Sequence, residues 1–157
     1  MGGDNRHNKR LKIFSRLLFV VYMLVTLHIL FMSELFGRYS CGHFRYNLTP
    51  FAEISRFYHL LGTRYTLQAV MNLFGNIVIL IPFGFYIAHF HRNYRIIVFT
   101  TTIYTFVFSL FVETIQLVTQ TGTFDVDDLI LNTFGGFLAA VMYKIYLIIR
   151  GKKHHED

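Results

Sequence analysis

Acidic residues lie inside or at the edge of long apolar stretches of this chain, where a charged side chain is costly. Glu113 lies within one such stretch, and Asp128 lies near the start of the next. A charge at the centre of a membrane helix costs about 2.5–3.5 kcal/mol on insertion scales, so it is usually kept for a function. Two carboxylates can also act together as general acid and base. Glu113 is therefore the best single functional candidate, and Glu113 with Asp128 is the candidate catalytic pair.

Amide side chains are predicted at the same depth as these acids. At about 1.5 Å of rise per helical residue, Asn72, Glu113 and Asn132 lie roughly 7–9 Å from the same end of their apolar stretches. Helical spacing puts Asn72 and Asn76 on one face, and Asp128 and Asn132 on another. Arg45 and Arg64, in the connection between the first and second apolar stretches, could approach an anionic headgroup from that loop. The candidate ligand-binding residues are Asn72, Asn76, Gln116, Asp125, Asn132, Arg45 and Arg64.

Several polar residues in the same stretches have a plain structural interpretation. Thr102, Thr105 and Ser109 form one polar stripe, and hydroxyls in membrane helices usually bond their own backbone. An intramembrane Asn often only joins two helices, which stabilises them by about 0.6–2 kcal/mol. Asp125 could serve only as the N-cap of the last helix, and Asp127 is predicted to be an exposed charge at that helix end.

The rest of the chain consists mostly of the elements that must position these groups. Hydrophobic residues make up 54% of the 157 and charged residues only 15%, which is too apolar for an ordinary soluble domain. A helix crosses a bilayer with roughly 20 mostly apolar residues. Four stretches reach this length, at residues 11–32, 67–90, 96–118 and 126–149. The sequence thus predicts an all-α bundle of four transmembrane helices, as a single domain over residues 1–157.

The basic residues predict how this bundle is oriented. With the N-terminus inside, 11 of the 15 Lys and Arg residues fall on the cytoplasmic side, where the positive-inside rule favours them. Both termini are then cytoplasmic, and the candidate site lies at the extracytoplasmic end. The excess of basic residues that gives the net charge of +6 is therefore a signal of membrane orientation. Binding to nucleic acid is not expected.

Cys41 offers a direct test of this orientation. It is the single cysteine, so the chain can form no internal disulfide, and it lies in the connection between the first and second stretches. We expect a membrane-impermeant maleimide to label Cys41 on intact cells or spheroplasts, because the predicted topology places this connection outside. Labelling that requires lysis would reverse the orientation and turn the candidate site toward the cytoplasm.

Local signals add detail to the bundle. Thr49 as N-cap with Pro50 in the first helical position predicts a short interfacial helix that continues to Leu61. Pro82 is expected to kink the second transmembrane helix. Small residues that let membrane helices pack closely continue the polar face of the last helix. They are Gly135, Gly136, Ala139 and Ala140.

Four short motifs, taken in order, resemble one known family. They are Asn47-Leu48-Thr49-Pro50-Phe51; Asn72 and Asn76 leading into Ile81-Pro82-Phe83-Gly84; Glu113-Thr114-Ile115-Gln116; and Asp125-Val126-Asp127-Asp128 with Asn132-Thr133-Phe134-Gly135-Gly136. Their order and spacing are similar to those of the VanZ family of bacterial membrane proteins. The resemblance implies a multi-pass protein of the bacterial cytoplasmic membrane. It also implies a role in tolerance of glycopeptide antibiotics such as teicoplanin, with which the name-giving member is associated.

Three kinds of activity remain open from the sequence. The leading one is a membrane protein that binds or alters an envelope component at the extracytoplasmic face and lowers glycopeptide action. The others are an intramembrane enzyme that modifies a lipid-linked headgroup, with Glu113 and an Asp as acid and base, and a proton- or ion-coupled carrier. No HExxH, GxSxG or Gly-rich phosphate loop is present, and neither a cofactor nor a metal is expected. The expected partner is a membrane lipid or lipid-linked envelope component, and the sequence leaves oligomerisation open.

Overall fold

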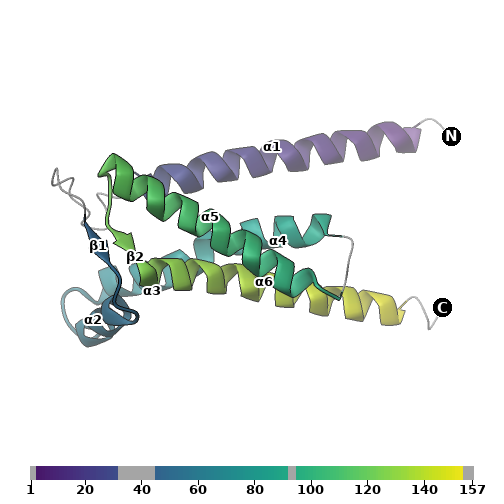
Figure 1. The fold of residues 1–157 in the computed structure, drawn as a ribbon. Coiled ribbons are helices and arrows are strands. Elements are labelled where there is room, and N and C mark those ends of the chain that lie inside the picture. The colour runs from purple at the N-terminus through teal and green to yellow at the C-terminus, as the bar shows by residue number, and fades with distance from the viewer. Residues whose placement is uncertain (1–2, 32–44, 92–94, 154–157) are drawn as a thin grey trace.

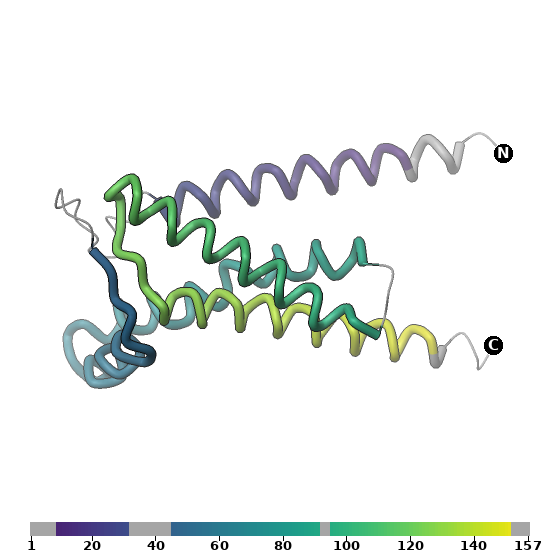
Figure 2. Tube along the Cα trace, in the orientation of Figure 1, coloured from purple at the N-terminus to yellow at the C-terminus, as the bar shows by residue number. Residues whose placement is uncertain are grey.

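Long helices and very short strands make up the structure. The computed structural model describes residues 3–31, 45–91 and 95–153, so Cys41 lies outside the described residues. The start of α1 (Gly3–Phe31) and the end of α6 (Val126–Lys153) lie at one end of the bundle, here called the terminal end. Helix α2 (Ala52–Leu60) and the strands lie at the other end, here called the strand end (Figure 1, Figure 2). In chain order the elements are α1 (Gly3–Phe31), β1 (Tyr46–Asn47), α2 (Ala52–Leu60), α3 (Thr66–Ile79), α4 (Ile81–Phe90), α5 (Ile97–Thr119), β2 (Phe124–Asp125) and α6 (Val126–Lys153).

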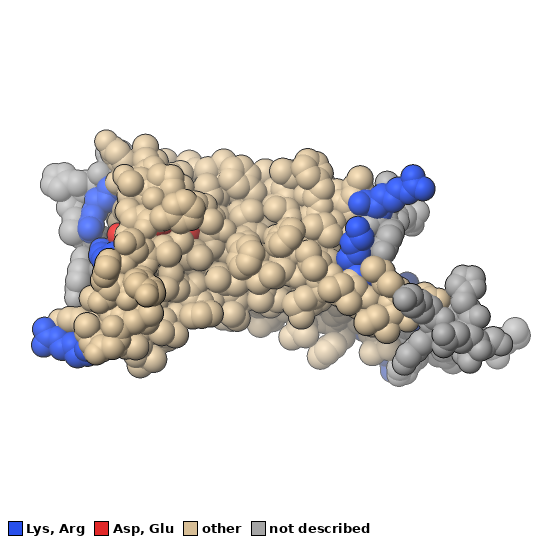
Figure 3. Space-filling model, turned by 90° about the horizontal axis from the view of Figure 1, so that it is seen from below, with Lys and Arg blue, Asp and Glu red and all other residues tan. Residues whose placement is uncertain are grey.

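Four helical segments are long and apolar enough to cross a membrane. They are Lys9–Phe31, Thr66–Phe90, Ile97–Thr119 and Val126–Gly151, which confirms the predicted spans to within about two residues at each end. Phe99 and Phe111 of α5 are exposed, whereas Thr105 and Glu113 on the same helix are buried. On the face shown in Figure 3, Lys and Arg gather at the two ends and uncharged side chains fill the band between them. This chain is a multi-pass membrane protein whose polar groups face the interior of the bundle.

The second span is broken at Leu80, between α3 and α4. Pro82 in the first turn of α4 has no backbone N–H, so the hydrogen-bond ladder of α3 cannot continue through this point. The hydroxyl of Tyr22 in α1 donates to the carbonyl of Ile79 at 2.5 Å and satisfies a backbone group beside the break. The kink predicted from Pro82 is confirmed.

Helix α6 packs against α3, α4 and α5 and so forms the centre of the bundle. Gly135 lies against the backbone of Ile77 in α3, and Gly136 lies against the side chain of Thr105 in α5. Ala139, one turn further along, is fully buried. The predicted close-packing face of this helix is confirmed.

The chain before α2 folds differently from the sequence prediction. Helix α2 begins at Ala52, and Phe51 before it has a left-handed backbone (φ 64°) with no side-chain cap of its own. Thr49, the predicted N-cap, instead donates its backbone N–H to the side-chain oxygen of Asn47 at 3.2 Å. The assignment of Thr49 as N-cap is therefore wrong, although the short helix is present. Strands β1 and β2 pair in parallel with Asn47 opposite Asp125, a pairing that the sequence does not predict.

Candidate functional site

Buried acids lie where α6 begins at the strand end of the bundle. Asp125, Asp127 and Asp128 are exposed by only 7%, 0% and 4%, and Glu113 of α5 by 1%. A buried carboxylate is tolerated only when other groups hydrogen-bond to it, so the partners of each acid show what it does.

Asp127 holds the start of α2 in place. One carboxylate oxygen accepts the backbone N–H of Phe51 at 2.5 Å, and the other accepts those of Glu53 and Ile54 at 2.8 and 3.1 Å. The first backbone N–H groups of a helix have no partner within the helix, and a negative charge beside them is favourable. The prediction that Asp127 is an exposed helix-end charge is wrong, because the loop before α2 folds over it.

Asp125 caps its own helix and joins two neighbouring segments. Its side chain accepts the backbone N–H of Asp127 at 2.8 Å, the arrangement of an N-cap, and the side-chain amide of Asn47 lies 3.3 Å away. Its backbone N–H donates to the Glu113 carboxylate at 3.0 Å. The N-cap interpretation of Asp125 agrees with this geometry. Asn47 was not among the predicted site residues, and its place in the first family-like motif was the signal that could have found it.

Amide side chains connect the remaining site residues across helices. Asn76 of α3 donates to the carboxylate of Asp128, and Asn132 of α6 donates to the hydroxyl of Ser109 at 3.0 Å. The amide of Gln116 donates to the carbonyl of Leu30 at 2.6 Å and ties α5 to the end of α1. The structure thus brings polar groups of α3, α5 and α6 together at the strand end.

The structure places the other predicted site residues differently. Asn72 lies on α3 at the walls of two cavities, and it has no hydrogen bond to an acid of the cluster among the described residues. The exposed Arg64 lies beside Tyr65, with its guanidinium carbon 4.7 Å from the ring centroid. Arg45 is exposed and accepts the backbone N–H of Phe124 at 3.0 Å through its carbonyl, next to the paired strands.

The hydroxyl stripe of α5 has the structural role expected for it. Thr102 and Thr105 donate to the carbonyl groups of Val98 and Thr101, four residues earlier, at 2.8 and 2.9 Å. These bonds satisfy the two threonine hydroxyl groups within the same helix, whereas the hydroxyl of Ser109 accepts the amide of Asn132 and joins α5 to α6.

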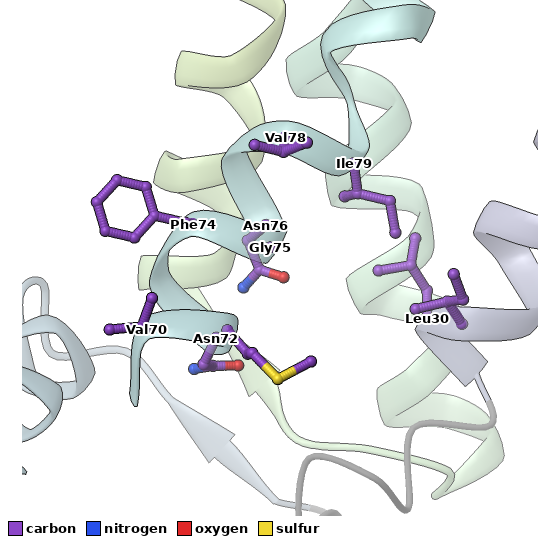
Figure 4. A pocket seen from close by; sticks show the side chains of 10 residues that line it. Leu30, Val70, Asn72, Phe74, Gly75, Asn76, Val78 and Ile79 are labelled. Carbon is purple, nitrogen blue, oxygen red and sulfur yellow. The ribbon is translucent and has the colours of Figure 1, made fainter. Parts of the chain in front are cut away.

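An apolar cavity of about 410 Å³ lies between α1 and α3. Leu30 of α1 and Met71 and Ile79 of α3 supply apolar wall, and Asn72 and Asn76 supply the polar part. In Figure 4 the two Asn side chains lie one turn apart on α3, with Leu30 across from that helix. Because Asn76 also bonds Asp128, one amide joins the cavity wall to the buried acids.

A second cavity, of about 310 Å³, lies between α2 and α3 and shares Asn72 with the first. Arg56, Tyr65 and Gln68 give this cavity a more polar wall. Asn72 therefore lines both the cavity beside α1 and the cavity beside α2, and the wall of the second is mostly apolar but more polar than that of the first. Arg56 and Gln68 were not predicted as site residues, because their positions in the sequence resemble those of ordinary surface residues.

Comparison with known proteins places the chain in a family. A curated relative, Protein VanZ of Enterococcus faecium, is 29% identical over 136 residues, which cover 84% of this chain and 74% of that protein. No solved structure matches the chain. The sequence model of the VanZ/LLP1 family matches residues 19–149 and so includes all the buried acids and both cavity-lining asparagines. This multi-pass membrane protein belongs to the VanZ/LLP1 family.

Proposed function

We propose that this protein binds a lipid-linked envelope component at the strand end of its bundle and thereby lowers the action of glycopeptides such as teicoplanin. The observation that carries the proposal is the double role of Asn76, which lines an apolar cavity and bonds a buried acid. An amphipathic ligand needs both environments within a few ångströms, with apolar wall for its chain and polar groups for its head.

The position of the two cavities supports a lipid-like ligand. The larger cavity lies between membrane-spanning helices, so the molecules beside it in a bilayer are acyl chains. The smaller cavity adds Arg56, whose guanidinium suits a phosphate, and Gln68. A ligand with its chain beside α1 would therefore place its head near Asn72.

The proposed location is the bacterial cytoplasmic membrane, with the strand end outside. Membership of the family and the Enterococcus faecium relative favour a bacterial envelope. The Lys and Arg asymmetry favours cytoplasmic termini. In this orientation the site reaches envelope components in the outer leaflet.

The proposal predicts that Glu113→Gln and Asp128→Asn lower function together. Each change removes a charge at nearly constant volume, and loss of a charged hydrogen-bond partner should weaken ligand binding about tenfold or more. The double variant should cost little more than the worse single variant, because residues that act as a unit are not additive. The measurement is the teicoplanin concentration that inhibits growth of a susceptible strain producing each variant, with the amount of protein in the membrane determined in parallel.

Thr114→Val is the matched control for these variants. Thr114 is the neighbour of Glu113 on α5, but its side chain is exposed and its hydroxyl donates to the carbonyl of Leu110 in the same helix at 2.7 Å, so the change keeps the volume and leaves the buried acids in place. The proposal fails if Glu113→Gln and Asp128→Asn accumulate normally and protect as well as the unchanged protein.

Native mass spectrometry of the purified protein should show a retained lipid-linked species, and chemical conversion of that species would instead indicate an enzyme.

A further inference from the structure

A separate cavity of about 360 Å³ lies near the terminal end of the bundle, between α1 and α4. Lys12, Ser15 and Arg16 of α1 line one side, and His89 and Phe90 of α4 line the other. It lies near the opposite end of the bundle from the site of the proposed function. Nothing in that function uses it.

The two walls of this cavity are held in fixed positions. Phe19 of α1 stacks on Tyr86 of α4, with ring centroids 3.5 Å apart, and this contact joins the two helices next to the cavity. Lys12 and Arg16 are four residues apart, so they lie on the same face of α1. The ring of His89 is oriented by the hydroxyl of Tyr143, 3.1 Å from Nδ1. The cavity is thus formed by packed helices and not by a loose surface loop.

The lining residues select one kind of ligand. Lys12 and Arg16 carry positive charge, Ser15 and His89 add hydrogen-bonding groups, and no carboxylate is among the described residues that line the cavity. This combination suits a phosphate, which accepts hydrogen bonds from all four groups. The apolar Phe90, together with Leu11, provides contact for hydrocarbon.

The depth of the cavity indicates where that phosphate comes from. It lies near Lys9 and Phe90, where the first two membrane spans end, and therefore at the level of lipid headgroups. Basic pockets between transmembrane helices on the side that carries the positive charges bind anionic headgroups. We propose that this cavity binds the phosphate of an anionic phospholipid from the leaflet at the terminal end, with the upper part of an acyl chain against Leu11 and Phe90.

Binding of phosphatidylglycerol to the purified full chain in detergent micelles tests this site. Phosphatidylglycerol should bind more tightly than phosphatidylcholine with the same acyl chains, as measured by native mass spectrometry or by the rise in unfolding temperature. The variant Lys12→Gln/Arg16→Gln should bind phosphatidylglycerol about 100-fold more weakly, because each substitution removes a charge-assisted hydrogen bond to the phosphate and each such loss is roughly a factor of ten.

The matched control is Lys9→Gln/Arg10→Gln. It removes the same charge from the same helix end, but these two exposed residues do not line the cavity. It should keep phosphatidylglycerol affinity close to that of the unchanged protein. Equal weakening in both double variants would mean general attraction to a basic surface and would overturn the site. Equal binding of phosphatidylcholine, or equal stabilisation by water-soluble glycerol phosphate, would also overturn it.

A measurement on the unchanged protein covers the case in which the double variant fails to fold. Reaction of lysine amines with an acylating reagent, followed by mass spectrometry, gives the rates at Lys12 and Lys9 separately. Phosphatidylglycerol should slow the reaction at Lys12 and leave Lys9 nearly unchanged, and phosphatidylcholine should slow neither. Protection of both lysines to the same extent would contradict the proposal.

Discussion

Gly135→Ala is expected to destabilise the bundle by about 3 kcal/mol or more, the upper part of the range for added volume in a packed core. The added Cβ would overlap the backbone carbonyl oxygen of Ile77. A backbone atom in a packed helix cannot rotate aside as a side chain can, so α3 and α6 would have to move apart. The change should appear as a lower unfolding temperature in detergent and as less protein in the membrane.

Gly75→Ala is the control for this prediction. Gly75 lies in α3, and an added Cβ there would meet no atom within 4 Å. Since alanine is the better helix former, this variant should be as stable as the unchanged protein or slightly more stable. Equal unfolding temperatures for Gly135→Ala and the unchanged protein would show that α3 and α6 are not in close contact at this point.

Asp127→Asn is expected to loosen α2 from the bundle and to cost about 2–3 kcal/mol, the range for hydrogen bonds to a charged group and for a buried donor left without a partner. Asp127 is fully buried and accepts three backbone N–H groups at the start of α2. An amide offers one acceptor oxygen and turns an N–H group toward donors. Hydrogen exchange at Phe51, Glu53 and Ile54 should become faster, and proteolysis between α2 and α3 should increase.

Tyr58→Phe supplies the comparison, because it removes a polar group from α2 itself and leaves Asp127 in place. The side chain of Tyr58 is 69% exposed, so we expect little change in exchange or in unfolding temperature. If Asp127→Asn leaves exchange of the three amides as slow as before, the carboxylate does not hold the start of α2. Because Asp127 supports the fold of the strand end, its variants are unsuitable as neutral controls in assays of function.

The membrane architecture could be predicted from local features of the sequence. Each span is a run of apolar residues long enough to cross a bilayer, and this length is fixed by helix rise and membrane thickness alone. The kink follows from Pro82, which lacks a backbone donor wherever its helix lies. The packing face of α6 follows from small residues at helical spacing, since only they allow such close approach.

The candidate site could be predicted in part. Depth counting placed Asn72, Glu113 and Asn132 at one level, whereas the bonds that join the three helices are those of Asn76 with Asp128 and of Asn132 with Ser109. Asn72 lies on the same helix face as Asn76 but borders the cavities instead. Which of the two asparagines meets the acid depends on where α3 crosses α6, and helical spacing alone does not contain that information.

The sequence by itself determined the spans, the kink and the close-packing face, because each depends on residue type and on spacing within one segment. It also indicated the family, through the order of four motifs along the chain. The tertiary structure alone decided the role of Asp127 and the pairing of β1 with β2. The partners in these contacts are more than 70 residues apart, as in the bond from Phe51 to Asp127. An acid at the start of a helix has the same local sequence whether water or a returning loop covers it. Only the folded position of that loop makes Asp127 a buried acceptor.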